Sequence, residues 1–191
     1  YLRVNFNAMS LKTKALISSV TNLSDARFAT GMGVDFIGFN IDENARDAIS
    51  LTDFTAITAW LEGPTMVGET SKIISKEKAL ELAQSFELGY MISDSEDQIE
   101  VFKDSGMTTF LRAEIISIGE IENINTVADY IIVETAQDFT IEDFNHLDLQ
   151  KPVFTANSFN SGNINDWIEQ TNITGIELRG SEEIRTGFVD L

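Results

Sequence analysis

The sequence predicts an α/β protein of one domain, a single (β/α)8 TIM barrel with short helices. Three observations support this fold class. The chain has 191 residues, the size of one ordinary domain. Eight short runs rich in β-branched and aromatic residues recur along it, and stretches with helical spacing follow them. Such alternation implies parallel strands joined by right-handed crossovers. Eight strands favour a closed barrel over the competing open, doubly wound sheet, whose Gly-rich first turn is absent.

The first half of the chain supplies four strand–helix units. Asn22 or Ser24 can cap the first helix, and Gly33 ends it. The apolar residues of the third helix recur at helical spacing. The strands are predicted at residues 15–20, 34–40, 64–70 and 88–93, and the helices at 24–32, 51–61, 75–86 and 96–103.

The second half of the chain continues the same alternation. The run 129–134 is the clearest strand, because its residues are nearly all apolar, as in strands buried on both faces. A final turn is expected from Glu182 onward. The remaining strands are predicted at residues 107–115, 152–157 and 174–178, and the helices at 118–127, 139–147 and 162–170.

The barrel domain is assigned to residues 9–191. Residues 7–10 resemble the point where a vector-derived segment joins a native chain that starts at Met9. Residues 1–8 are therefore expected to be a vector-derived or disordered N-terminus. An extended native N-terminus is the alternative.

Composition excludes several classes of function. The chain carries 13 Lys and Arg against 31 Asp and Glu, a net charge of −18, which argues against a nucleic-acid or anionic-membrane partner. The absence of cysteine excludes disulfides, thiolate metal sites and a cysteine nucleophile, and the single His146 leaves no histidine metal cluster. No apolar run reaches 18 residues, so a membrane span is excluded. The expected location is the cytoplasm.

Polar side chains follow the predicted strands, and in barrels of this class the chemistry lies at these strand ends. An acid there is often only a helix cap or a solvated loop charge. Glu134 differs because it directly follows the apolar run of its strand, and partial burial would suit it to acid–base work; the structural alternative is an ion pair with Arg112. The full set is Ser18, Asn40, Asp42, Glu69, Asp94, Arg112, Glu114, Glu134, Asn157, Ser158, Glu177 and Arg179.

The loops after the last two strands are candidates for binding a phosphate through backbone N–H groups. Gly180 and Ser181 could begin such a nest after the last strand. Asn157 and Ser158, after the preceding strand, lack the glycines that allow a close backbone approach.

Paired segments near both ends of the chain match one set of family patterns. Thr21-Asn22-Leu23-Ser24-Asp25-Ala26 and Gly33-Val34-Asp35-Phe36-Ile37-Gly38-Phe39 are similar to Cys-Gly-x-Thr-x-x-x-Asp-Ala followed by Gly-Ala-Asp-x-x-Gly-Phe. Pro152-Val153-Phe154-Thr155-Ala156-Asn157-Ser158-Phe159-Asn160, then Asn163-Ile164 and Gly175-Ile176-Glu177-Leu178, are similar to Pro-Val-x-x-Ala-Gly-Gly-Leu-x-Pro-x-Asn-Val and Gly-Val-Asp-Val. The chain thus resembles the phosphoribosylanthranilate isomerases from Leu16 to Asp190.

The resemblance implies an intramolecular oxidoreductase of tryptophan biosynthesis. The family converts N-(5'-phosphoribosyl)anthranilate, an aminoaldose, into an aminoketose by an Amadori rearrangement. Its general base, a cysteine, falls on Ser18, and its general acid, an aspartate, falls on Glu134. We therefore expect a phosphorylated small-molecule substrate, no cofactor, and a monomer or homodimer.

The resemblance also implies a substrate-binding set. A loop arginine near the anthranilate carboxylate falls on Arg46, and the phosphate-binding glycines fall on Asn157 and Ser158. With the strand-end and loop residues named above, the set is Arg46, Arg112, Asn157, Ser158, Gly180 and Ser181.

The departures from the family pattern predict a divergent paralogue with weak or lost native activity. A serine hydroxyl stays protonated without a strong neighbouring base, so an acid such as Glu114 would have to replace the thiolate. Two alternatives stay open: a non-catalytic binding module, or a barrel that binds a different small molecule or a divalent cation. The cation would be Mg²⁺ or Ca²⁺, held by carboxylates from different strands. These carboxylates are Glu69, Glu114, Glu134 and Glu177.

Overall fold

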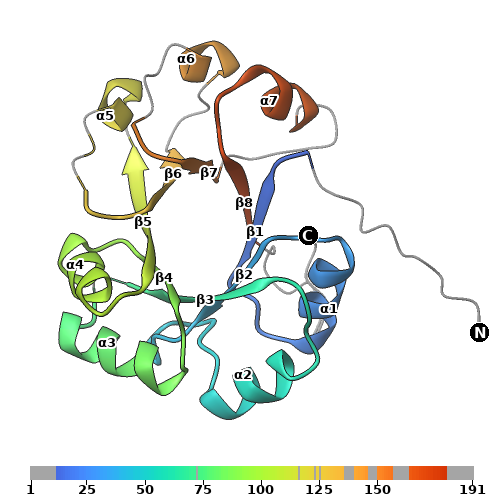
Figure 1. The fold of residues 1–191 in the computed structure, drawn as a ribbon, viewed down its shortest axis with the longest axis vertical. Helices are drawn as coiled ribbons and strands as arrows, with labels where there is room; N and C mark the ends of the chain where they lie inside the picture. Colours follow the sequence, from blue (N-terminus) through green and yellow to red (C-terminus); the bar gives the residue numbers. More distant parts are fainter. Residues whose placement is uncertain are drawn as a thin grey trace, which may run out of the picture.

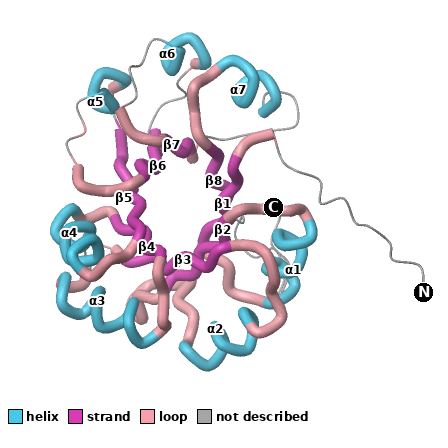
Figure 2. The backbone as a smooth tube through the Cα atoms, in the orientation of Figure 1, coloured by secondary structure: helices cyan, strands magenta, loops and turns pink. Residues whose placement is uncertain are grey.

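The computed structural model describes residues 12–71, 73–115, 117–122, 124, 126–135, 140–145, 150–156 and 164–179. Within these residues, eight parallel strands form one closed barrel, and the helices lie around its outside (Figures 1 and 2). Several predictions lie outside the described residues: the N-terminal segment 1–8, the turn from Glu182, and the residues His146, Asn157, Ser158, Gly180 and Ser181.

The eight strands follow one another around the barrel in chain order. Each strand pairs in parallel with the next, and β1 closes the ring by pairing with β8: Leu16 lies opposite Phe36 on one side and Glu177 on the other. The predicted (β/α)8 barrel is confirmed. The strands are β1 (Lys14–Ser18), β2 (Phe36–Asn40), β3 (Thr65–Thr70), β4 (Tyr90–Ser93), β5 (Thr108–Ile115), β6 (Tyr130–Thr135), β7 (Val153–Thr155) and β8 (Gly175–Arg179).

The helices connect successive strands across the outer face of the barrel. Their first turns carry the caps that the sequence indicates: Leu23 begins α1, so Asn22 and not Ser24 is its cap, and the Asn22 side chain accepts the Asp25 N–H at 3.0 Å. The helices are α1 (Leu23–Gly31), α2 (Leu51–Thr58), α3 (Lys76–Ser85), α4 (Glu96–Asp104), α5 (Ile118–Glu122), α6 (Ile141–Asn145) and α7 (Ile164–Gln170).

Two element boundaries differ from the prediction for local reasons. Strand β1 ends at Ser18 and not at residue 20, because Ser19 adopts a left-handed conformation with φ of 57° that turns the chain. Helix α5 ends at Glu122 and not at residue 127. Beyond it, the hydroxyl of Thr126 accepts the N–H of Ala128 at 3.1 Å, a side-chain contact that competes with helical backbone hydrogen bonds.

The inside of the barrel changes from apolar to polar along the strands. Successive inward positions are two residues apart, so on β3, β5 and β6 the residue above each core side chain is ionisable. This change places the candidate site at the C-terminal end of the barrel. The apolar layer is a buried cluster of Leu16, Phe36, Val67, Ile92, Phe110, Ile132 and Phe154.

Gly38 makes room for the polar layer above this cluster. A Cβ atom at Gly38 would lie 2.4 Å from Oε1 of Glu69 and 3.3 Å from the Cα of Ser18. A larger residue there would therefore displace the Glu69 carboxylate, so the glycine fixes where that charge lies.

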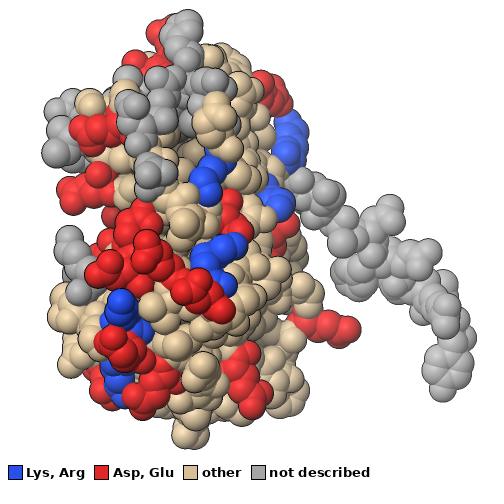
Figure 3. Space-filling model, turned by 60° about the vertical axis from the view of Figure 1, so that its left-hand side comes forward, with Lys and Arg blue, Asp and Glu red and all other residues tan. Residues whose placement is uncertain are grey.

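The surface carries the excess acidic charge. Acidic side chains gather over much of the face that Figure 3 shows, among fewer basic ones. Of the helices within the described residues, none has the length and apolar character needed to cross a membrane.

Candidate active site

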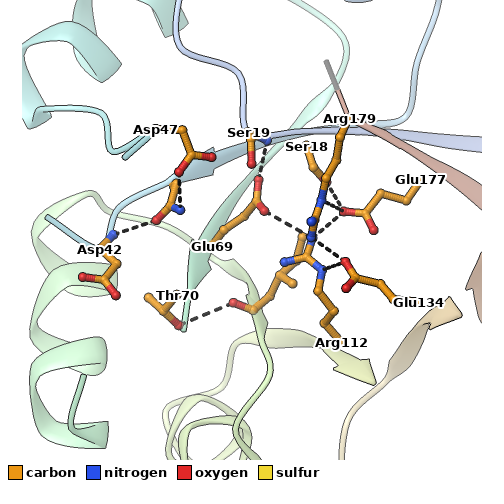
Figure 4. A network of polar contacts seen from close by, with 12 residues as sticks. Ser18, Ser19, Asp42, Asp47, Glu69, Thr70, Arg112, Glu134, Glu177 and Arg179 are labelled. Carbon is orange, nitrogen blue, oxygen red and sulfur yellow. Dashed lines mark hydrogen bonds and ion pairs between the residues drawn. The ribbon is translucent and has the colours of Figure 1, made fainter. Parts of the chain in front are cut away.

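Arg112 on β5 is the centre of a cluster of charged side chains inside the C-terminal mouth of the barrel (Figure 4). Its Nη2 donates to Oε1 of Glu177 on β8 and lies 3.2 Å from Oε2 of Glu69 on β3. Its Nε lies 3.1 Å from Oε1 of Glu134 on β6. That third contact is an ion pair without a hydrogen bond, because the N–H is not aimed at the oxygen.

Arg179, at the end of β8, joins two of the same glutamates from the solvent side. Its Nη2 lies 2.6 Å from Oε1 of Glu134, and its Nε lies 3.7 Å from Oε1 of Glu177. The Arg179 side chain is 45% exposed and that of Glu134 is 32% exposed, whereas the side chain of Glu177 is completely buried. Glu134 and Arg179 are thus the members of the cluster that incoming molecules meet first.

Ser18, at the end of β1, contacts the deepest glutamate. Its hydroxyl donates to Oε1 of Glu177, and both residues are buried. The other oxygen of that carboxylate, Oε2, is buried without a hydrogen-bond partner among the described residues. A buried acceptor without a partner is costly, so such groups are exceptions that mark sites of strain or function.

Glu69 holds the opposite side of the cluster. Its Oε1 accepts the backbone N–H of Ser19 at 2.7 Å, so the turn after β1 and the end of β3 are joined through this carboxylate. Burial raises the pKa of the Glu69 carboxyl above its ordinary value, because desolvation outweighs the opposing charge of Arg112. The carboxyl therefore takes up a proton more readily than an exposed glutamate.

Arg112 stays charged in this environment. Burial by itself would lower its pKa, but the neighbouring charges of Glu177, Glu69 and Glu134 outweigh burial and raise it. Three carboxylates around two guanidinium groups leave the cluster with one excess negative charge when all are ionised. The site therefore holds preorganised charge of both signs in a water-poor region.

The four glutamates considered for a cation do not share one position. Glu69, Glu134 and Glu177 do converge, but on the guanidinium of Arg112, which already occupies the place of a cation. Glu114 lies near the end of β5 with an exposed side chain. Among the residues that the structure describes, no three His, Cys, Asp or Glu side chains are placed to hold a metal ion.

The other sequence-predicted residues lie around this cluster. Arg46 is exposed in the loop between β2 and α2, on the same end of the barrel. Asp42 in that loop is buried and accepts the Ser71 hydroxyl at 2.9 Å, so it joins the loops that follow β2 and β3.

Sequence reasoning placed Arg179 at this strand end but did not predict its ion pairs with Glu134 and Glu177. It missed Gln98 on α4, which is buried and accepts the hydroxyls of Thr70 and Ser93 at 2.8 and 2.7 Å. Its amide donates to the carbonyls of Ser71 and Ile74 at 2.8 and 2.9 Å, which fixes the loop after β3. A single glutamine in a helix gives no sequence signal for this role.

The fold and the cluster together define a (β/α)8 barrel with a cluster of charged side chains at the C-terminal mouth, where enzymes of this fold carry their active sites. No protein-family model matches the chain. A curated relative is 22% identical over 189 residues, which cover 92% of this chain and 90% of the relative: the N-(5'-phosphoribosyl)anthranilate isomerase of Petrotoga mobilis. The resemblance of this chain to the phosphoribosylanthranilate isomerases is therefore confirmed over nearly all of its length.

Solved structures of the same kind confirm the fold. The phosphoribosylanthranilate isomerase of Thermus thermophilus has a TM-score of 0.78 at 16% identity, over 93% of this chain and 92% of that one. The enzyme of Thermotoga maritima has a TM-score of 0.70 at 18% identity, over 93% of both chains. A further phosphoribosylanthranilate isomerase structure, with a TM-score of 0.70 at 19% identity over 93% of this chain and 92% of that one, contains reduced 1-(o-carboxyphenylamino)-1-deoxyribulose 5-phosphate.

Proposed function

We propose that this chain isomerises N-(5'-phosphoribosyl)anthranilate, or a closely related phosphorylated aminoaldose, to the corresponding aminoketose. One observation carries the proposal. Glu134, at the family's acid position, pairs with Arg112, and Ser18, at the base position, donates to Glu177, which itself pairs with Arg112, so both lie in one cluster at the barrel mouth. This arrangement occurs in a chain that is similar to these isomerases along nearly its entire length.

Glu134 is proposed as the general acid. Of the three glutamates in the cluster, its side chain is the most exposed, so it is the carboxyl that a substrate in the mouth can reach. Protonation of the sugar ring oxygen by this carboxyl breaks the C1–O bond and leaves a protonated imine between C1 and nitrogen. The carboxyl must therefore be protonated when the substrate is in place.

Ser18 and Glu177 are proposed to act together as the base. The C2–H bond breaks, its electron pair forms the C1–C2 double bond, and the imine pair moves to nitrogen. The resulting enolamine becomes the aminoketose when C1 takes up a proton and the C2 hydroxyl loses one. The proton from the C2–H bond passes to Oγ of Ser18 while the hydroxyl proton of Ser18 passes to Oε1 of Glu177, which already accepts it. Glu177 thus takes the role for which the sequence suggested Glu114, whose side chain is exposed elsewhere on the rim.

The rearrangement changes no overall oxidation state, because C2 is oxidised as C1 is reduced. It therefore needs no redox cofactor, and the groups required are an acid, a base and anion-binding residues. The ligand in a similar structure is a phosphorylated analogue of this reaction's product. We propose a phosphorylated substrate for this chain on the same basis.

The test is a fluorescence assay of isomerase turnover with N-(5'-phosphoribosyl)anthranilate. General acid–base groups contribute about 10²- to 10⁴-fold, so Glu134→Gln and Ser18→Ala should each lower kcat by that order. The matched control is Glu100→Gln, an exposed glutamate on α4 that should leave kcat unchanged.

The same assay tests the expectation of weak native activity. Turnover by wild type and by the Petrotoga mobilis enzyme should be measured side by side, and we expect this chain to be slower. Folded wild-type protein without turnover above background, or full turnover in Glu134→Gln, would contradict the proposed function.

A further inference from the structure

Arg179 combines exposure with two ion pairs. Its side chain is 45% exposed at the mouth, while that of Arg112 is 13% exposed and surrounded by three carboxylates. The ion pairs recorded for Arg179 within the described residues use Nη2 and Nε. A guanidinium carries five N–H donors in a planar fork, so the group has donors to offer a second anion.

The same contacts occupy one carboxyl oxygen of the proposed acid. Glu134 lies between two guanidinium groups, at 2.6 Å from Arg179 and 3.1 Å from Arg112. Both guanidinium groups lie against Oε1, so a proton can be given from this oxygen only if at least one of these pairs breaks. Arg112 is enclosed by three glutamates at the centre of the cluster, which leaves the more exposed Arg179 as the partner that can turn away.

Arg179 also covers the proposed base. Its Nε lies 3.7 Å from Oε1 of Glu177, the oxygen that accepts the Ser18 hydroxyl. Ser18 and Glu177 are both buried, and Figure 4 shows the Arg179 side chain beside both the Glu177 and the Glu134 carboxylates. Movement of this single side chain would release the acid and expose the base together.

We propose that Arg179 binds an anionic oxygen group of the substrate, and that it exchanges Glu134 for this group when the substrate enters. The inference rests on the proposed function, because it names how that site recognises its substrate. The ligand chemistry is a phosphate or carboxylate held by the guanidinium fork. In the sequence, Arg179 directly precedes Gly180 and Ser181, which are predicted to bind phosphate. We therefore expect the substrate's phosphate to be the anionic group that Arg179 binds.

The exchange makes a specific prediction for binding. Glu134 and the substrate anion compete for one guanidinium, so removal of the Glu134 charge should strengthen ligand binding, but only while Arg179 is present. A purely structural Arg179 predicts no such dependence. The probe is the reduced 1-(o-carboxyphenylamino)-1-deoxyribulose 5-phosphate that a similar isomerase binds.

The experiment measures Kd of this probe by calorimetry for wild type, Arg179→Ala, Glu134→Gln and the double variant. A charge-assisted contact supports a loss of about 10- to 100-fold in Arg179→Ala. We expect Glu134→Gln to bind about 5- to 10-fold more tightly than wild type, within the range of exposed ion pairs and hydrogen bonds to charged groups. The double variant should show no such gain over Arg179→Ala.

Three controls make the result decisive. Arg179→Lys, which keeps the charge without the fork, should bind between wild type and Arg179→Ala, and circular dichroism should show each variant folded. Arg27→Ala changes an exposed arginine on α1 and should leave Kd unchanged. The dephosphorylated probe shows which anionic group Arg179 binds. If Arg179→Ala no longer weakens binding of this probe, Arg179 binds the phosphate; if it still weakens binding, Arg179 binds the carboxylate.

The outcomes also separate this inference from the proposed function. A wild type that turns the substrate over while Arg179→Ala binds the probe equally well overturns the inference and leaves the function standing. Equal tightening by Glu134→Gln with and without Arg179 overturns the exchange. A wild type that neither binds the probe nor turns the substrate over overturns both.

Discussion

Arg112→Met removes the cation at the centre of the cluster and retains most of the side-chain volume. The two carboxylates that lose their main partner are nearly sealed from water, since the side chain of Glu177 is 0% exposed and that of Glu69 is 4% exposed. Breaking a buried ion pair by removing one partner costs about 3–5 kcal/mol, because the remaining charge is left uncompensated. Both carboxylates share this one partner, so we expect its removal to lower the unfolding free energy by about 3–5 kcal/mol.

The assay is urea unfolding at pH 7.5, followed by circular dichroism, with a thermal scan on the same samples. For a chain of this size, about 1 kcal/mol corresponds to about 2–4 °C, so the expected fall in Tm is about 6–20 °C. The double variant Arg112→Met with Glu177→Gln removes one uncompensated charge and should be more stable than Arg112→Met alone.

A surface ion pair supplies the control. Lys78 lies 3.3 Å from Glu81 on α3, with side chains 39% and 67% exposed, so Lys78→Met should cost no more than about 0.5 kcal/mol. A loss below about 1 kcal/mol in Arg112→Met, or a double variant less stable than the single one, would show that the buried charges are not coupled as described.

Two further predictions concern the residues around the cluster. The raised pKa of Glu69 means that the folded state holds the carboxyl proton more tightly than the unfolded chain does, so this group's contribution to stability is full below the ordinary pKa of 4.5 and is lost as pH rises through the raised pKa. Urea midpoints measured across this pH range should therefore fall for wild type, and Glu69→Gln should remove that fall. An unchanged pH dependence in Glu69→Gln would refute the assignment. Gln98→Leu removes the oxygen that accepts the hydroxyls of Thr70 and Ser93 and should cost about 2–6 kcal/mol in urea unfolding, at about 1–3 kcal/mol for each of the two buried groups. A loss below about 1 kcal/mol would show that the loop after β3 does not depend on this glutamine.

The sequence determined the barrel and the order of its elements. Strand and helix periodicity, together with local caps, are properties of short segments, so they can be read without tertiary contacts. The Asn22 cap and the apolar strand at 130–135 illustrate this, because each depends on neighbouring residues alone. The predicted helix α5 was too long, because the Thr126 hydroxyl competes for backbone hydrogen bonds and apolar periodicity does not reveal that competition.

The sequence also located the strand ends that carry the site, and it offered the Glu134–Arg112 ion pair as one alternative. That ion pair is present at 3.1 Å. The resemblance placed Ser18 and Glu134 at the base and acid positions, and the structure brings them into one cluster. The phosphate-binding roles of Asn157, Ser158, Gly180 and Ser181, and the substrate contact of Arg46, stay predictions.

Only the tertiary structure decided which charges meet. Glu114 and Arg112 point to the same side of β5, yet Arg112 is enclosed by glutamates from three other strands while Glu114, two residues nearer the rim, is exposed. Which partners surround a strand-end charge depends on the register and stagger of all eight strands, and a linear pattern of residues does not specify these. The pairing of Ser18 with Glu177, 159 positions apart, arises from closure of the barrel between β1 and β8.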